Sequence, residues 1–509
     1  MTTNKKNGKV YLVGAGPGRE DLITVRGAQL LKTADCVIYD KLANPALLKY
    51  TSPSAEIIHV PKRIGDGSFT QRQINKLLLD KASDGKTVVR LKGGDPCIFG
   101  RGAEEAELLA NAGIDFEIVP GVTAAIAVGA YAAVMLTDRN YSSQVLFVTG
   151  QEAPGKKQSS IDWELLAKFS GTIVFYMAMG NLPLIADRLI KNGMTETTPV
   201  AVIADATFPT QRIVKAPLAS IDLECKKQNL GPPAVVVIGA AAKSNPNLNW
   251  FIKKPLFGKN IVITRDKKGN ADFASKIISR AANPIHFPTL KIIPLTQTNS
   301  FLETLARLAN YEWLIFTSKN GVTIFFDSLQ SLQKDARVFA SAKIAAIGRQ
   351  TAAELSRFGI RADFLPTVFT AKELARQLID FAGLKGRKIL LLRSQLASDE
   401  LVQLLKKTGA EITEQPVYTV ETEKNDSAPL TKQISAGAID WLTFTSPSSV
   451  NGFFEQIPLN VVKESAVKVA SIGPVTSKQL QNLDVKVDAT ATEHTIDGLL
   501  AAIEEKYQK

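Results

Sequence analysis

Two glycine-rich turns in the first half of the chain hold residues suited to binding a small ligand. An apolar run ends in VGAGPG at residues 13–18, and TVVRLKGGDP at 87–96 repeats this pattern. The adjacent Gly93 and Gly94 let the backbone approach a ligand closely. Asp95 adds a negative group that could pair with an amine or a hydroxyl, although it could equally cap a tight turn or the next helix.

The first turn departs from the dinucleotide-binding pattern, in which Asp40 after the second strand would bind a ribose. That pattern spaces its glycines as G-x-G-x-x-G, whereas here Gly14, Gly16 and Gly18 alternate. Pro17 stiffens the turn and removes one N–H donor. The turn therefore favours a neutral or cationic ligand over a pyrophosphate, and a nicotinamide-dependent oxidoreductase is disfavoured.

Short apolar runs alternate with helical segments in this half, which is typical of an α/β fold with a largely parallel sheet. The expected strands lie at 10–16, 35–40, 87–92, 144–150, 171–177, 199–205 and 233–239. The sequence becomes polar and proline-bearing between residues 242 and 259. We therefore expect a domain over 1–250 with lobes at about 8–119 and 120–250, followed by a linker over 251–258.

The second half, residues 259–509, contains a diverged internal repeat. LIFTSKNGV at 314–322 returns as LTFTSPSSV at 442–450, and AAIGRQTAAEL at 345–355 returns as ASIGPVTSKQL at 470–480. NIVITR similarly matches KILLLR, and HFPTLKI matches EQPVYTV. A repeat of this length predicts two similar α/β lobes rather than a solenoid. A cleft between such lobes is a common place for a ligand.

Composition and charge exclude several classes of protein. The chain has 509 residues, of which 45% are apolar and 22% charged, as in soluble proteins with several domains. Its net charge is +12, and no dense basic block occurs. The absence of a basic block argues against nucleic-acid binding, and the positive net charge favours clefts that attract small anions. A slightly basic surface that serves solubility is equally consistent with the net charge.

The three cysteines and three histidines are scattered, which makes a disulfide framework or a metal site improbable. The first residues lack the apolar core of a signal peptide, so we expect a cytoplasmic protein. The uncharged stretch 118–137 contains glycines and a proline and is rich in alanine. It predicts a buried helix rather than a membrane span.

The first half resembles the tetrapyrrole (precorrin) methyltransferase family, and within it most closely the uroporphyrinogen-III C-methyltransferases. The resemblance runs from Val10 to about Ile252 and is carried by YDKL (39–42), PKRIG (61–65), GGDP (93–96) and PGVTAA (120–125). It implies two α/β lobes with S-adenosylmethionine between them, in a homodimer. The family's cofactor contacts fall on Pro17, Gly93, Gly94, Asp95, Ile98, Thr123, Ala124, Met177 and Ala206.

The same resemblance places a proton acceptor at Asp40 and a proton donor at Lys62. Methylation of a pyrrole carbon makes a cation that must lose a proton, which a nearby carboxylate can stabilise and accept. Lys62, with Arg63 beside it, can alternatively clamp the substrate's carboxylates. We favour the clamp, because an exposed lysine is a poor acid near neutrality.

Two positions depart from the family's pattern. Asp138 stands where the family commonly has histidine. Because an acid would repel an anionic substrate, we expect Asp138 to be a structural position or to lie away from the substrate's carboxylates. Ala206 stands at a family glycine. A methyl group fits there if the contact uses the backbone, whereas cofactor affinity suffers if closer approach is needed.

The second half resembles uroporphyrinogen-III synthase, on VITR, FPTL, WLIFTSKNGV, AAIG, PVYTVE and SIGPVTS. This implies two lobes joined by crossing strands, one from about 259–288 plus 420–509 and the other from 289–419. The family tyrosine suggested to assist hydroxyl loss falls on Tyr418, which could instead pack between the lobes. Backbone N–H groups at strand-to-helix turns suit carboxylate binding, which gives the substrate-binding candidates Thr317, Ser318, Thr351, Thr445, Ser446 and Thr476.

Together the resemblances imply a bifunctional enzyme of tetrapyrrole biosynthesis. Its second half would cyclise hydroxymethylbilane to uroporphyrinogen III without a cofactor, inverting the last ring. Its first half would methylate that product at carbons 2 and 7 to give precorrin-2, toward sirohaem or corrinoids. The alternative is a methyltransferase for a later precorrin fused to a non-catalytic two-lobed binding module.

Overall fold

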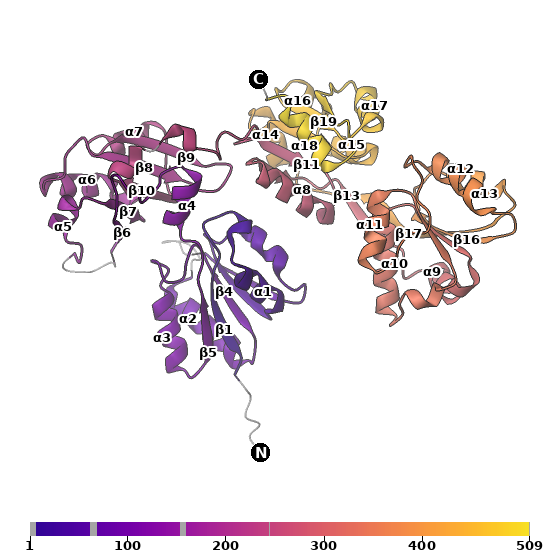
Figure 1. The fold of residues 1–509 in the computed structure, drawn as a ribbon, viewed down its shortest axis with the longest axis horizontal. Coiled ribbons are helices and arrows are strands. Elements are labelled where there is room, and N and C mark those ends of the chain that lie inside the picture. The colour runs from indigo at the N-terminus through magenta and orange to yellow at the C-terminus, as the bar shows by residue number, and fades with distance from the viewer. Residues whose placement is uncertain (1–6, 62–68, 153–158, 244, 508–509) are drawn as a thin grey trace, which may run out of the picture. The chain divides into compact units, whose positions relative to one another are not determined.

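The computed structural model divides the chain into two units, one built mainly from residues 1–260 and the other mainly from 261–503 (Figure 1). Each unit contains two five-stranded sheets covered by helices. The predicted α/β class is therefore confirmed in both halves. The residues that the structure describes are 7–61, 69–152, 159–243 and 245–507.

The first lobe of the N-terminal unit is a parallel sheet with the strand order β3-β2-β4-β1-β5. Its strands are β1 (Lys9–Gly14), β2 (Cys36–Asp40), β3 (Glu56–Val60), β4 (Val88–Lys92) and β5 (Asp115–Val119). Helices α2 (Gln71–Ser83) and α3 (Gly102–Asn111) pack on one face, and α1 (Val25–Thr33) packs on the other. Because the strands are parallel, the loops that follow them meet at one edge.

The second lobe of this unit has a mixed sheet with the order β6-β7-β10-β8-β9, in which only β6 and β7 run parallel. Its strands are β6 (Val145–Thr149), β7 (Thr172–Tyr176), β8 (Pro199–Ala204), β9 (Arg212–Pro217) and β10 (Ala234–Ile238). Helix α4 (Ala124–Tyr131) covers one face. The other face is covered by α5 (Trp163–Lys168), α6 (Leu182–Lys191) and α7 (Ile221–Lys227).

Helix α4 forms within the uncharged stretch that was tested for a membrane span. It has eight residues, and four of them are buried in the core beneath the second sheet. Within the described ranges of the chain, no helix combines the length and the apolar character needed to cross a bilayer.

The C-terminal unit contains the sheets β12-β11-β18-β19-β20 and β13-β17-β16-β14-β15. The strands are β11 (Asn260–Ile263), β12 (Asn283–His286), β13 (Leu290–Pro294), β14 (Trp313–Phe316), β15 (Lys343–Ala346), β16 (Lys388–Ser394), β17 (Glu411–Thr422), β18 (Trp441–Phe444), β19 (Lys468–Ser471) and β20 (Ala489–Thr490). The helices include α8 (Lys267–Ser279), α9 (Asn299–Ala306), α10 (Lys319–Ser331), α11 (Arg349–Arg357), α12 (Ala371–Ala382), α13 (Glu400–Lys406), α14 (Ala428–Ser435), α15 (Pro447–Phe454), α16 (Leu459–Lys463), α17 (Pro474–Asn482) and α18 (Ile496–Glu504).

The internal repeat appears as matching strand order in these two sheets. In the sequence repeat, β11 corresponds to β16, β18 to β14, β19 to β15, and β12 to the first half of β17. The order β12-β11-β18-β19 in one sheet therefore matches the order β17-β16-β14-β15 in the other. The strand pairing at the edge of the sheet is also repeated. Ala470 of β19 pairs with Ala489 of β20, and the equivalent Ala345 of β15 forms an isolated parallel bridge with Phe364. Strand β13 pairs antiparallel with the second half of β17. The predicted repeat of two similar α/β lobes is confirmed.

Candidate active sites

Three loops that follow β1, β4 and β5 pack backbone against backbone at the carboxyl edge of the first sheet. Ala15 N donates to Lys92 O at 2.7 Å, and Gly16 and Gly94 exchange hydrogen bonds of 3.2 and 2.8 Å. A Cβ built on Gly121 would lie 2.3 Å from Gly94 O, so any side chain there would push the loops apart. The glycines thus allow a close approach of three loops.

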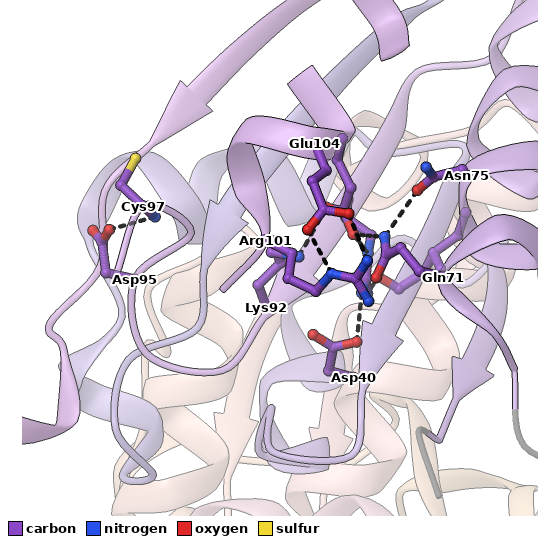
Figure 2. Close-up of polar contacts among 11 residues, drawn as sticks. Asp40, Gln71, Asn75, Lys92, Asp95, Cys97, Arg101 and Glu104 are labelled. Carbon is purple, nitrogen blue, oxygen red and sulfur yellow. Dashed lines mark hydrogen bonds and ion pairs between the residues drawn. The ribbon is translucent and has the colours of Figure 1, made fainter. Parts of the chain in front are cut away.

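Asp95 ties two of these loops together. Its side chain is buried, and Oδ1 accepts a hydrogen bond from Cys97 N at 2.7 Å while Oδ2 accepts one from Gly121 N at 2.8 Å (Figure 2 shows the first). Helix α3 begins only at Gly102, so Asp95 caps its own turn and not that helix. The carboxylate therefore fixes the loop geometry, and its direct contact with a cofactor stays a prediction.

A tyrosine joins the two lobes beside these loops. Tyr176, the last residue of β7, has its Oη 2.7 Å from Thr123 Oγ1 and accepts a hydrogen bond from Ala125 N at 3.0 Å. Burial raises the pKa of the Tyr176 phenol, so the hydroxyl stays protonated at neutral pH. The ring centroid of Phe99 lies 5.1 Å from that of Tyr176. Met177 follows with a φ of 54° and is 49% exposed.

A second contact between the lobes holds the first glycine turn. Arg19 N donates to Thr207 Oγ1 at 3.0 Å, and Thr207 N donates to Gln211 Oε1 at 3.0 Å. Thr207 is fully buried and adopts a φ of 77°. Because Pro17 lies two residues before Arg19 and Ala206 directly precedes Thr207, the structure brings together the turns that carry these two expected cofactor contacts.

Asp40, the expected proton acceptor, ends β2 beside a buried cluster of charged side chains (Figure 2). Arg90 Nη2 donates to Asp40 Oδ1 at 2.5 Å, and Arg90 Nε lies 3.4 Å from Glu105 Oε1. Lys92 Nζ donates to Glu105 Oε2 at 2.8 Å. The side chains of Arg90, Lys92 and Glu105 are at most 1% exposed, whereas that of Asp40 is 18% exposed. Asp40 is thus the member of the cluster that solvent and a substrate can reach.

The other sequence-based candidates of this half divide into two groups. Lys62 and Arg63 lie outside the described residues, so their roles stay predictions. Asp138 lies in a tight turn, where it exchanges backbone hydrogen bonds with Ser142 and its Oδ1 accepts one from Asn140 N at 2.8 Å. This local contact agrees with the structural role expected for Asp138.

The charged cluster and Tyr176 are the features of the site that the sequence analysis missed. A signal for the cluster was present, since VVRLK places two cations two residues apart and therefore on one face of an otherwise apolar strand. Their partner Glu105 lies on α3 and Tyr176 reaches across from β7, and no local pattern indicates such contacts.

In the C-terminal unit, the expected strand-to-helix turns contain capped helix starts. Ser318 caps α10 by accepting a hydrogen bond from Gly321 N at 2.9 Å, and Ser446 caps α15 by accepting one from Ser449 N at 3.1 Å. The corresponding positions before α11 and α17 are Gly348 and Gly473. All four turns end a strand and begin a helix, as predicted.

Tyr418 lies in β17 and packs into the core of its own lobe, with 7% of its surface exposed. Its Oη donates to Ser318 Oγ at 3.1 Å, which connects it to the start of α10. Thr351 and Thr476 are 4% and 3% exposed, which favours packing over direct contact with a substrate. Thr317 and Thr445 are half-buried beside the two capping serines. The substrate-binding roles of these residues stay predictions.

Two family models match the chain. Tetrapyrrole (corrin/porphyrin) methylases match residues 9–222, and uroporphyrinogen-III synthase HemD matches residues 271–501. A relative matches almost end to end, since the porphyrin biosynthesis protein HemD of Ruminiclostridium josui is 36% identical over 498 residues, with 97% of each chain covered. The chain belongs to this family of fused tetrapyrrole methylases and uroporphyrinogen-III synthases.

Further relatives match parts of this methylase–synthase. The uroporphyrinogen-III C-methyltransferase of Bacillus subtilis (strain 168) is 38% identical over 356 residues, which cover 70% of this chain and 72% of the relative. The S-adenosyl-L-methionine-dependent uroporphyrinogen III methyltransferase of Methanosarcina barkeri is 48% identical over 232 residues, which cover 46% of this chain and 91% of the relative. The methylase–synthase is therefore a bifunctional enzyme of tetrapyrrole biosynthesis.

Proposed function

We propose that the methylase–synthase cyclises hydroxymethylbilane to uroporphyrinogen III with inversion of the last ring, and methylates this product at carbons 2 and 7 to give precorrin-2. The occurrence of both families on one chain carries the proposal, because the product of the synthase half is then the substrate of the methyltransferase half. The net charge of +12 supports it, since both substrates are polycarboxylates.

We assign methylation to residues 1–250 and cyclisation to residues 259–509. Within them, the lobes span about 8–119 and 120–250, and about 259–288 plus 420–509 and 289–419, with a linker at 251–258. The strands of the four sheets fall within these bounds, apart from the last residues of β17, which supports the division.

S-adenosylmethionine is the methyl donor in this proposal, and the loops at the carboxyl edge fit it. Gly94 has a φ of 67°, a backbone conformation that favours glycine, and a Cβ built on it would be 3.8 Å from Thr123 Cα and 4.0 Å from Ala124 N, so this turn lies against two further expected cofactor contacts. Gly93 and the half-buried Ile98 belong to the same turn. When bound, the cofactor supplies an electrophilic methyl group.

Asp40 performs the proton chemistry of methylation in this proposal. The pyrrole carbon that gains the methyl group becomes part of a cation, and the Asp40 carboxylate stabilises that charge and accepts the proton that must leave. Its partial exposure and its hydrogen bond from Arg90 support this role. Lys62 and Arg63 bind the carboxylates of the macrocycle.

The synthase half needs no cofactor in this proposal, because loss of the substrate's hydroxyl as water creates the electrophile that closes the ring. Tyr418 assists that loss through its hydroxyl, which lies in contact with Ser318 Oγ. The helix starts at Ser318 and Ser446, with the adjacent Thr317 and Thr445, bind carboxylates and keep the chain's ends close. Thr351 and Thr476 support the two neighbouring turns.

We further propose a cytoplasmic homodimer that associates through the methyltransferase half. All three cysteines are free, which suits a reducing compartment.

Labelling decides between this function and its alternatives. We expect the full chain, given uroporphyrinogen III and S-adenosylmethionine with a 13C-methyl group, to produce a tetrapyrrole labelled at carbons 2 and 7, observed by NMR. No label in the product would favour a later precorrin as substrate.

The synthase half is tested by complementation. We expect the chain to complement a strain that lacks uroporphyrinogen-III synthase, and failure would favour a non-catalytic binding module in the second half.

A further inference from the structure

A buried charged cluster of Arg90, Lys92 and Glu105 lies beside Asp40, and of its members only Arg90 has a part in the chemistry proposed so far. Arg90 and Lys92 are two residues apart on β4, so both side chains point to the face of the sheet covered by α2 and α3. Glu105 reaches them from α3, and Gln71 reaches Glu105 from α2. Figure 2 labels Gln71, Lys92 and Asp40 of this group. The cluster thus connects both covering helices to the edge of the sheet at which Asp40 lies.

The burial of these charges is not explained by stability. Removing an ion from water costs several kcal/mol, and apolar residues of similar volume in place of a buried ion pair are often neutral or stabilising. Apolar residues already fill the rest of this face, including Leu12 and Val88 beside the cluster. The presence of Arg90, Lys92 and Glu105 at these buried positions therefore points to a task that apolar side chains could not perform.

The hydrogen bonds form a chain that ends on Asp40. Glu105 Oε1 accepts from Gln71 Nε2 at 2.9 Å and faces Arg90 Nε at 3.4 Å, while Oε2 accepts from Lys92 Nζ at 2.8 Å. The other side of the guanidinium donates to Asp40 Oδ1 at 2.5 Å and to Ile38 O at 3.3 Å. Because the guanidinium is held on both sides, it cannot rotate away from the Asp40 carboxylate.

Lys92 balances the charge of Glu105. Burial lowers the pKa of the Lys92 ammonium, and the nearby Arg90 acts in the same direction, whereas Glu105 opposes both. The Glu105 carboxylate therefore offsets the repulsion between the Lys92 ammonium and the Arg90 guanidinium. A variant that removes the charge of Glu105 alone would leave Lys92 as an unpaired buried cation, so the two positions need to be changed together.

We propose that Glu105 is a positioning residue for methyl transfer, which holds Arg90 so that the Asp40 carboxylate faces the substrate in one orientation. This inference rests on the proposed role of Asp40 in methylation. A mispositioned carboxylate slows proton removal even when both substrates are bound. The effect of losing the anchor should therefore fall on kcat for methylation and not on cofactor affinity.

Two double variants of the full chain separate positioning from charge balance. Glu105→Gln with Lys92→Met retains an oxygen that can accept from Arg90 Nε, whereas Glu105→Met with Lys92→Met has a similar volume and lacks that acceptor. Both remove the same pair of charges. We expect the glutamine variant to stay within about threefold of wild-type kcat, and the methionine variant to lose at least about tenfold, with S-adenosylmethionine affinity within about twofold in both.

Glu107→Gln is the matched control, because Glu107 lies two residues after Glu105 on α3 and is exposed to solvent. We expect it to leave kcat unchanged. Equal kcat in the two double variants, at equal melting temperature, would overturn the inference. Should neither double variant fold, Gln71→Met removes one donor to Glu105, and an unchanged kcat for it would likewise overturn the inference. A wild-type chain that transfers no methyl group would instead overturn the proposed function itself, and this inference with it.

Discussion

At the residue scale, Asp95 offers a test of whether the two activities use separate sites. Asp95→Ala leaves the N–H groups of Cys97 and Gly121 without their acceptor, so the turn at Gly94 loses its shape. We expect S-adenosylmethionine affinity, measured by calorimetry, to fall at least about tenfold. Cyclisation of hydroxymethylbilane should be unchanged, and loss of both activities in a folded protein would contradict separate sites.

Asp40 is tested by a substitution that keeps its shape. Asp40→Asn retains an oxygen that can accept from Arg90 but is a far weaker base. We expect kcat for methylation to fall about 100-fold or more, with only a small change in cofactor affinity. Steady-state kinetics and a binding titration on the same preparation measure both quantities. A larger effect on affinity than on turnover would remove the role assigned to Asp40.

Cys97 reports on the cofactor turn, because it follows Asp95 by two residues and is exposed. Burial, with Asp95 acting in the same direction, raises the pKa of its thiol, so less thiolate is present at neutral pH than in a free cysteine. We expect slow alkylation near pH 7 that accelerates at more alkaline pH, where more of the thiol is ionised. Saturating S-adenosylmethionine should slow the reaction at that higher pH.

The two other cysteines serve as internal controls for this labelling. Cys36 and Cys225 are buried, and desolvation raises the pKa of each thiol to about 11. Both should stay unmodified in the folded chain, as peptide mapping by mass spectrometry can verify. Alkylation of Cys97 at the same rate with and without cofactor would show that this turn does not bind it.

At the element scale, the repeated helix starts of the synthase half allow a matched comparison. Ser318→Ala and Ser446→Ala each remove an N-cap, which costs about 1 kcal/mol of stability. Only Ser318 also contacts the Tyr418 hydroxyl. We expect similar losses of thermal stability, and a marked loss of cyclisation in Ser318→Ala alone. Equal turnover in the two variants would separate Tyr418 from the chemistry.

The elements themselves were largely predictable. Strands such as VYLVG and GTIVFY are apolar runs next to glycine, and the repeated FTS turns at 316–318 and 444–446 indicate two similar lobes from the sequence alone. The antiparallel pairing in the second sheet was not predicted, because strand direction depends on contacts between distant segments. The same reason hid the Glu105 cluster, since its members come from β2, β4, α2 and α3.

At the scale of the whole molecule, each unit contains its own candidate site, and in the proposed function the two chemistries share one intermediate. In the proposed function, hydroxymethylbilane is the substrate of one half, and methylation by the other half requires that a ring has formed. A single incubation therefore examines both assignments and their order.

The most direct measurement supplies hydroxymethylbilane and S-adenosylmethionine to the purified chain and identifies the tetrapyrrole by mass spectrometry and NMR. We expect precorrin-2, and uroporphyrinogen III when the methyl donor is omitted. A tetrapyrrole whose last ring is not inverted, with no methyl group incorporated, would contradict both assigned activities.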